Sequence, residues 1–363
     1  MFLTATNLVH YLIERGTVDM NSVMNGQFVV MEAGRRNRNF KVLQSAEQGL
    51  FIKQVKVVDS VENTTLRREA NCYRLAQNYA AWSELMPRFV DHDLTRQCLT
   101  VGLLDDAENL SEHHWRLQQF PTSVGELLGS ALGRFHQATS ELLNDSGATH
   151  FFPRRIPWIF AFHRDNNRVS GAVIELGELV RQHAELHESM DRLRETWHFN
   201  SVIHGDAKWD NFVVYKGHDE STHMKIVDWE LIDFGDCAWD VGGTLHSYLA
   251  HWIAAMPFAE TTQTEQLISK THSSLIQMQP AMSAYWCSYL AASKLSHAMH
   301  QDFLIRCLEY AAARLLQTAF EYSYYAAQIS AHALMLVHIS REILKNPSLA
   351  ARELFGIEME IAA

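Results

Sequence analysis

Short apolar runs separated by polar turns occupy the first hundred residues. The runs are rich in β-branched and aromatic side chains, a composition typical of strands. Five strands are predicted here, after a short helix over residues 4–15 that ends at Gly16. The strands are expected at residues 28–31, 40–43, 50–55 with an extension to Val58, 88–90 and 97–104.

A helix is expected between the third and fourth strands, over residues 63–78. Leu66, Ala70 and Tyr73 are spaced at i, i+4 and i+7 and form its apolar face. Glu69 lies on the same inward face, three residues after Leu66. A carboxylate turned inward needs a cationic partner, because burying an unpaired charge is costly.

The pattern becomes mostly helical beyond residue 104. Helices are expected over residues 125–137 and 172–197. From Gly242 the helical pattern continues to the end of the chain. Breaks are expected near Pro257, Pro280 and Pro347.

One stretch departs from this helical pattern. A polar octet, His204 to Asn211, precedes an apolar strand over residues 212–215. The turn-rich residues 216–220 then reverse the chain, and a second apolar strand ends at Asp228. The stretch therefore predicts a loop followed by a hairpin with an acid at its far end.

The hairpin brings particular polar groups together. In an antiparallel pair the start of the first strand lies beside the end of the second, so Asn211 and Asp228 become neighbours. Carboxylate and amide oxygens in small number suit Mg²⁺, which keeps waters and takes substrate phosphates as further ligands. Asp206 lies five positions before Asn211 and is left to orient or deprotonate a hydroxyl.

Composition narrows the possible functions. The 363 residues are 47% hydrophobic and 20% charged, which favours a substantial core. A net charge of −11 argues against nucleic acid as the main partner. Five scattered cysteines without a C-x-x-C pair are typical of reduced thiols in a cytoplasmic protein. No apolar run predicts a membrane span, and no secretory signal is recognisable.

The pattern H-G-D-x-x-x-x-N, followed by a strand and I-V-D-W-E, resembles the aminoglycoside phosphotransferase and choline kinase superfamily. That superfamily shares its architecture with protein kinases. The resemblance implies that Asp206 accepts the hydroxyl proton and that Asn211 and Asp228 hold Mg²⁺. Residues 235–240 resemble the G-D-P-x-x-D segment of the family, with Cys237 in place of proline, and are expected to be structural.

The resemblance extends upstream. Lys53, flanked by apolar residues, resembles the strand lysine that pairs with the α- and β-phosphates, and is preferred over Lys41 and Lys56. Glu69 matches the family's R-E-A element, whose glutamate pairs with that lysine. Leu103 and Leu104 match the hinge, where backbone groups would bind the adenine of ATP.

Two interpretations remain open at this stage. The arginine-rich residues 32–39 either cover ATP phosphates or form an exposed basic hairpin tip. Lys208 stands where protein kinases have lysine in H-R-D-x-K-x-x-N. It either stabilises the transferring phosphoryl group or pairs with Asp210 or Glu230 at the surface.

The expected fold is α+β, a two-lobed protein-kinase-like fold with a small antiparallel-sheet lobe and a larger, mainly helical lobe. The expected boundaries are residues 1–104 and 105–363. The expected function is ATP- and Mg²⁺-dependent phosphoryl transfer to a hydroxyl of a small molecule. Two alternatives remain: the same chemistry on Ser or Thr of a peptide, or a pseudokinase that binds without turnover. No membrane or nucleic-acid partner is expected.

Overall fold

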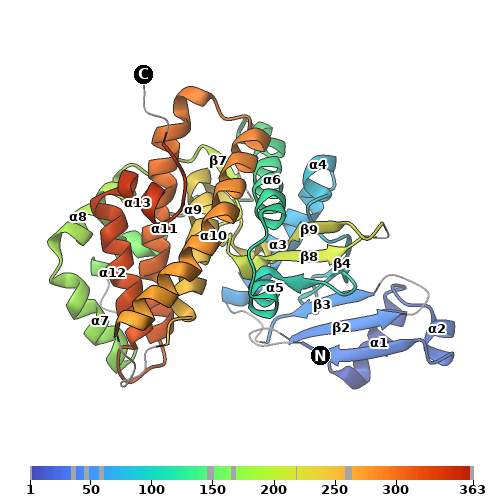
Figure 1. Ribbon diagram of the computed structural model, residues 1–363. Coiled ribbons are helices and arrows are strands. Elements are labelled where there is room, and N and C mark those ends of the chain that lie inside the picture. Colours follow the sequence, from blue (N-terminus) through green and yellow to red (C-terminus); the bar gives the residue numbers. More distant parts are fainter. Residues whose placement is uncertain are drawn as a thin grey trace. The chain divides into compact units, whose positions relative to one another are not determined.

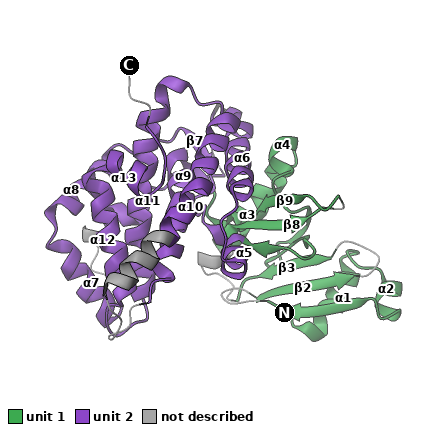
Figure 2. Ribbon diagram, viewed as in Figure 1, with its two compact units in different colours: residues 1–109, 211–232 green, residues 110–210, 233–363 purple. Residues whose placement is uncertain are grey.

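The computed structural model describes residues 2–33, 38–44, 49–56, 61–144, 151–164, 169–217, 219–257 and 264–359. Two compact units are distinguished in Figure 2. Unit 1 comprises residues 1–109 and 211–232, and unit 2 comprises residues 110–210 and 233–363. The predicted hairpin therefore belongs to the unit that contains the N-terminal sheet, whereas the loop before it belongs to the helical unit.

Unit 1 is built on an antiparallel five-stranded sheet, drawn in Figure 1. The strand order is β1-β2-β3-β5-β4, and every neighbouring pair is antiparallel. All five predicted strands are confirmed, although β5 is shorter than expected. The bounds are β1 Phe28–Glu32, β2 Arg38–Gln44, β3 Leu50–Gln54, β4 Phe89–Asp93 and β5 Cys98–Gly102.

Helix α1 (Ala5–Glu14) supplies much of the core on this sheet. The Thr4 side chain and that of Asn7 form a reciprocal capping box at its start. Buried residues of α1 join buried strand residues in one apolar cluster, which anchors the helix. This cluster includes Leu8, Tyr11, Leu12, Phe40, Val42, Leu50 and Ile52.

Helix α3 (Val61–Ala76) follows β3 and turns its apolar face inward as predicted. Leu66, Ala70 and Tyr73 are all buried, and Glu69 is buried with them. Two short helices, α2 (Met20–Met24) and α4 (Ala80–Ser83), complete the helical part of unit 1. Neither was predicted, because four or five residues carry too little periodicity to detect.

The predicted hairpin is present in a second sheet of unit 1, ordered β6-β8-β9. Strands β8 (Phe212–Lys216) and β9 (Thr222–Ile226) pair antiparallel, with Phe212 opposite Ile226. The two-residue strand β6 (Glu108–Asn109) pairs with the other edge of β8. This register fixes the start of β8 beside the end of β9.

Unit 2 is mainly helical, with a small pair of strands, β7 (Ser201–Ile203) and β10 (Asp233–Gly235). Helices α6 (Thr122–Ala138) and α10 (Thr264–Ser293) pack against one another. Glycines 125, 129 and 133 of α6 permit this approach, since a Cβ on Gly129 would meet the Tyr285 carbonyl oxygen at 2.1 Å. The helices are α5 Leu110–Leu117, α6 Thr122–Ala138, α7 Gly171–Arg181, α8 Ala184–Glu195, α9 Cys237–Ala254, α10 Thr264–Ser293, α11 His300–Ser323, α12 Ala331–Lys345 and α13 Pro347–Glu353.

Three helix predictions in unit 2 were wrong in detail. The single helix expected over 172–197 is two helices, separated at His183, whose ψ of 86° is not helical. Helix α9 begins at Cys237 rather than near Gly242. Pro280 lies inside α10 and does not break it, because the flanking turns bury apolar side chains and this burial outweighs the missing N–H. The expected breaks near Pro257 and Pro347 are present.

No helix among the described residues is long and apolar enough to span a bilayer.

All five cysteines are free thiols.

Candidate functional site

Three charged residues predicted for the nucleotide meet inside unit 1. Lys53 comes from β3, Glu69 from α3 and Asp228 from the turn after β9. The Lys53 Nζ donates to Oε2 of Glu69 at 2.7 Å and to Oδ1 of Asp228. The side chains of Lys53 and Glu69 are 10% and 5% exposed, whereas that of Asp228 is 39% exposed. A buried ion pair is thus joined to a carboxylate that solvent can reach.

The charges in this cluster keep the lysine protonated. Burial opposes its positive charge, but the carboxylates of Glu69 and Asp228 outweigh burial and hold the pKa of Lys53 above its ordinary value. Lys53 therefore presents a fixed cation.

Asn211 and Asp228 lie at the same end of the hairpin. The Val227 N–H donates to the Asn211 carbonyl oxygen at 2.9 Å, which continues the β8–β9 pairing by one step. Asp228 has φ 63° and ψ 55°, a left-handed conformation that is uncommon for a residue other than glycine. The buried Trp229 holds the turn, since its Nε1–H donates to the Ile226 carbonyl oxygen at 3.0 Å. Such strain often marks functional turns.

The oxygens at this end of the hairpin fit a hard cation. One carboxylate and one side-chain amide oxygen are the donor types that Mg²⁺ prefers, and Asp228 is accessible. Within the described ranges, no group of three or more His, Cys, Asp or Glu side chains could hold a metal by itself. A magnesium ion here would therefore depend on phosphate oxygens and waters for its remaining ligands.

A second cluster, in unit 2, surrounds Asp206. Arg314 Nη2 lies 2.7 Å from its Oδ1, and Lys208 Nζ lies 2.8 Å from its Oδ2. Burial opposes ionisation, but the charges of Arg314 and Lys208 lower the pKa of Asp206 to about 2. Lys208 therefore contacts Asp206 and not the Asp210 carboxylate considered in the sequence analysis. At neutral pH the cluster holds an ionised, oriented carboxylate.

The loop that carries Asp206 is held by helix α9. The buried Asp240 carboxylate accepts from the backbone N–H groups of His204 at 2.6 Å and Gly205 at 3.0 Å. It also bonds His136 Nε2 at 3.2 Å. Asp236 caps the start of α9 by accepting from the Ala238 N–H. The structural role expected for residues 235–240 agrees with these contacts.

The remaining nucleotide-side predictions are placed in unit 1. Leu103 and Leu104 follow β5 and are half-buried, and the Leu103 N–H donates to the Gly49 carbonyl oxygen at 2.7 Å. The arginine-rich loop over residues 32–39 lies partly outside the described residues, as does the predicted extension of β3 to Val58.

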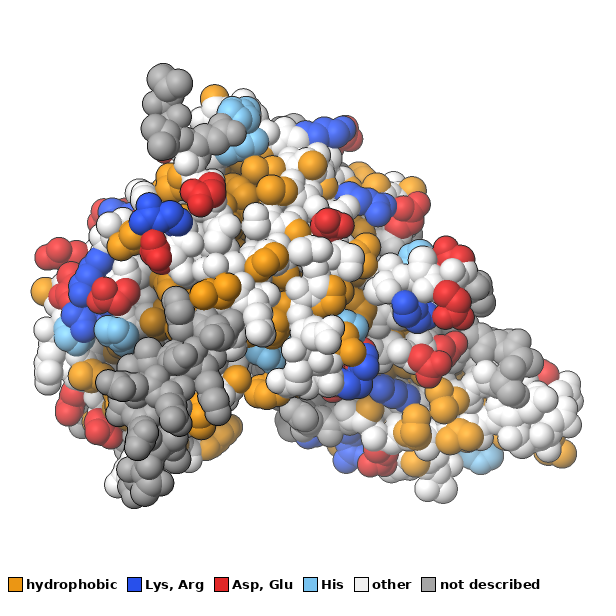
Figure 3. All heavy atoms as spheres, in the orientation of Figure 1, with side chains coloured by type: hydrophobic (Ala, Val, Ile, Leu, Met, Phe, Trp, Pro, Cys, Tyr) orange, Lys and Arg blue, Asp and Glu red, His pale blue; other side chains and the backbone are white. Residues whose placement is uncertain are grey.

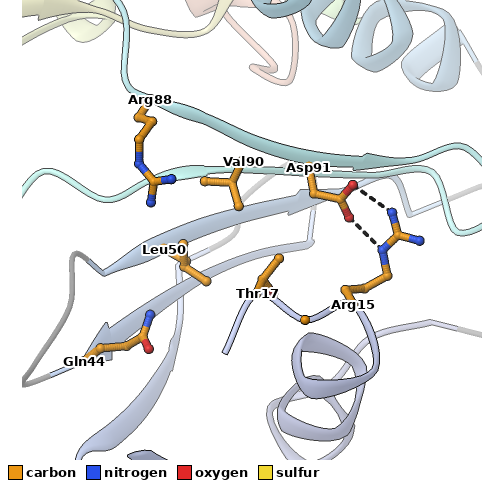
Figure 4. A pocket seen from close by; sticks show the side chains of 8 residues that line it. Arg15, Thr17, Gln44, Leu50, Arg88, Val90 and Asp91 are labelled. Carbon is orange, nitrogen blue, oxygen red and sulfur yellow. Dashed lines mark hydrogen bonds and ion pairs between the residues drawn. The ribbon is translucent and has the colours of Figure 1, made fainter. Parts of the chain in front are cut away.

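Two surface pockets of unit 1 are separate from the Lys53 cluster. The first, about 410 Å³ and shown in Figure 4, is lined by residues that include Arg15, Gln44, Arg88 and Asp91. The second, about 630 Å³, is lined by residues that include Tyr73, Phe89, Leu104 and Lys225. Neither lining contains Lys53, Glu69 or Asp228. On the face drawn in Figure 3, acidic and basic side chains are intermingled.

Arg314 is the residue of this site that sequence reasoning missed. It lies on α11, 108 positions after Asp206, in a helix whose pattern indicates only packing. The one available signal is a charged residue within a run of buried apolar positions, Ala311 to Leu316.

Comparisons with known proteins agree with this fold. A sequence profile of the phosphotransferase enzyme family matches residues 28–272. No curated protein matches the chain in a sequence search.

Three solved structures illustrate the likeness. A choline/ethanolamine kinase family protein from Mesorhizobium loti is 17% identical with a TM-score of 0.52, over 97% of this chain and 98% of that one. Choline kinase from Cryptosporidium parvum is 14% identical with a TM-score of 0.55, over 96% and 98%. A macrolide 2′-phosphotransferase from Brachybacterium faecium is 16% identical with a TM-score of 0.52, over 98% and 100%. The predicted two-lobed kinase-like fold is confirmed.

Proposed function

We propose that this chain, which belongs to the phosphotransferase enzyme family, transfers the γ-phosphoryl group of ATP to a hydroxyl of a small molecule. The observation that carries the proposal is the cluster of Lys53, Glu69 and Asp228. An ammonium fixed between two carboxylates, one of them accessible and in a strained turn, fits the phosphate-binding part of a kinase.

On the nucleotide side, Lys53 binds the α- and β-phosphate oxygens, and Glu69 keeps its ammonium in place. Asn211 and Asp228 are the residues that would hold Mg²⁺, which neutralises charge on the phosphates when bound. The chain itself contributes position and charge, because little covalent chemistry is required of the protein in this reaction.

On the acceptor side, Asp206 accepts the hydrogen bond of the attacking hydroxyl and aligns its oxygen with the γ-phosphorus. The new bond forms from that oxygen to phosphorus while the bond to the β–γ bridging oxygen breaks, and the hydroxyl proton passes to Asp206. A carboxylate with a pKa of about 2 is a weak base. Asp206 therefore acts mainly by orientation, with proton transfer late, as suits a loose transition state.

A small molecule is favoured as acceptor over a peptide. The similar structures include kinases named for choline and for a macrolide, which are small hydroxyl-bearing compounds. Lys208 is the residue type that protein kinases have at this position, but its contact with Asp206 serves a small alcohol and a peptide equally. A pseudokinase is disfavoured, since Lys53, Asp206 and Asp228 are all present.

The experiment is an ADP-release assay with ATP and Mg²⁺ against a panel of amino alcohols, sugars, macrolides and Ser/Thr peptides. Acceptor-dependent ADP release with a small molecule supports the proposal. Release with peptides alone would support the peptide alternative. Nucleotide binding without release for any acceptor would support the pseudokinase alternative.

Nucleotide binding should require Mg²⁺ and should stabilise the fold. At a ligand concentration of 100 times the Kd, binding to the folded state adds about 2.7 kcal/mol to the free energy of unfolding. Calorimetry and thermal unfolding of the parent and of Asp228→Ala, with and without Mg²⁺, measure this. Equal ATP affinity in all four samples would contradict the metal assignment.

Lys208→Ala should lower turnover by about 10²-fold with little change in nucleotide affinity, because its contact with the transferring group strengthens only in the transition state. Lys216→Ala, which removes an exposed hairpin lysine, is the matched control and should leave both quantities unchanged. Steady-state kinetics and calorimetry measure the two effects. If Lys208→Ala turned over as fast as the control, Lys208 would be a surface charge with no part in the transfer.

A further inference from the structure

Arg314 reaches the Asp206 carboxylate from α11, a helix outside the H-G-D-x-x-x-x-N and I-V-D-W-E motifs. Its guanidinium donates through Nη2 to Oδ1 of Asp206 at 2.7 Å, and its side chain is only 6% exposed. The same guanidinium lies over the Trp239 ring, 5.3 Å from the centroid. Arg314 is thus held by both the Asp206 carboxylate and the Trp239 ring, and its positive charge lies beside the loop that carries Asp206.

A row of polar side chains on α11 holds the guanidinium further. Arg314 Nη1 lies 3.5 Å from Oε1 of Gln317, and Gln317 Nε2 donates to Oε1 of Glu321 at 2.8 Å. These residues are spaced at i, i+3 and i+7, so they lie on one face of the helix. These hydrogen bonds restrict the guanidinium so that its Nη2 faces Oδ1 of Asp206.

We propose that Arg314 is a positioning residue for phosphoryl transfer, which binds Oδ1 of Asp206 so that the carboxylate stays ionised and its Oδ2 stays with Lys208 and the acceptor hydroxyl. This inference rests on the proposed function. Arg314 acts through Asp206 and does not itself touch the acceptor. Arginine suits this role because its planar fork contacts Asp206 and Gln317 together, which a lysine ammonium does less well.

Other charged groups around Asp206 do not replace Arg314. Lys208, on the same loop, contacts Oδ2 and is 36% exposed, so solvent screens it more. His246 of α9 stays neutral at physiological pH, because burial and then the charge of Arg314 lower its pKa to about 3. Glu321 of α11 accepts from Gln317 Nε2 and supplies no positive charge. Loss of Arg314 therefore removes the main buried cation on this carboxylate.

The test compares Arg314→Gln and Arg314→Lys with the parent. In Arg314→Gln the pKa of Asp206 should rise by about 1–3 units, the range that a neighbouring arginine accounts for. Because the transfer needs Asp206 ionised, the acidic limb of the kcat/KM profile should move to higher pH by the same amount. Turnover at neutral pH should fall by about 10²-fold through misplacement, and Arg314→Lys should restore part of it.

The matched control is Arg306→Gln, which removes another arginine–aspartate pair of α11, the one with Asp236. It should leave the pH profile unchanged. Adding Arg314→Gln to Asp206→Asn should cause little further loss, because the first residue acts through the second. Thermal unfolding and ATP affinity of each variant separate misfolding from misplacement.

Carbon-13 NMR titration of the Asp206 carboxyl gives a readout that needs no turnover. Absence of transfer by the parent would refute the proposed function, whereas the titration still decides whether Arg314 sets the ionisation of Asp206. An unchanged titration and an unchanged acidic limb in Arg314→Gln would overturn the inference. A full further loss in the double variant would overturn it as well.

Discussion

Asp206→Asn is expected to lower turnover by about 10²–10⁴-fold while ATP affinity stays near that of the parent. The asparagine keeps the shape of the side chain but removes the negative charge that orients the hydroxyl and accepts its proton late in the transfer. ATP affinity should persist because Lys53, Asn211 and Asp228 belong to unit 1, whereas Asp206 belongs to unit 2. Steady-state kinetics and calorimetry measure the two quantities.

The substitution also leaves Arg314 and Lys208 without their carboxylate. Asp206→Glu is a useful companion, because it retains the charge and moves it by one methylene. The free energy of unfolding of Asp206→Glu should be closer to that of the parent than the value for Asp206→Asn is. Asp206→Glu should still lose turnover. If Asp206→Asn turned over within a few-fold of the parent, Asp206 would have no part in the transfer.

Lys53→Met is expected to lower the free energy of unfolding by about 3–5 kcal/mol and to abolish ATP binding. The substitution leaves Glu69 buried, 5% exposed and without its cationic partner, which is the costly way to break a buried ion pair. It also removes the cation assigned to the α- and β-phosphates. Chemical denaturation gives the stability, and calorimetry gives the affinity.

The double variant Lys53→Met/Glu69→Met separates these two effects. Replacing both partners by apolar side chains of similar volume should recover most of the lost stability, because no buried charge is left unpaired. Asp228 is 39% exposed and can be solvated. ATP binding should not recover. A stable double variant that binds ATP like the parent would remove Lys53 from the nucleotide site.

The grouping of residues on the nucleotide side of the candidate site could be predicted in part because its signals are local. Glu69 is placed by the period of one helix, and Asn211 is placed beside Asp228 by the pairing of two adjacent strands. The polar spacing of the loop before the hairpin singled out Asp206 in the same way, and its role in the transfer stays a prediction. Each of these inferences uses residues that lie within one helix, one loop or one hairpin.

Arg314 could not be found in this way, because its contact with Asp206 depends on how α11 packs within unit 2. Pro280 is a related case. The sequence pattern predicts a break there, but burial of the neighbouring turns keeps α10 continuous. Contacts that depend on the packing of distant helices leave no periodic signal in the chain.

Phosphorus-31 NMR of ATP, Mg²⁺ and each candidate acceptor tests the central claim most directly, because it identifies the product of the γ-phosphoryl group. The account predicts a phosphoester signal of the acceptor that grows in step with ADP in the parent and is nearly absent in Asp206→Asn. ADP formed together with inorganic phosphate alone, at equal rates in the parent and Asp206→Asn, would contradict it.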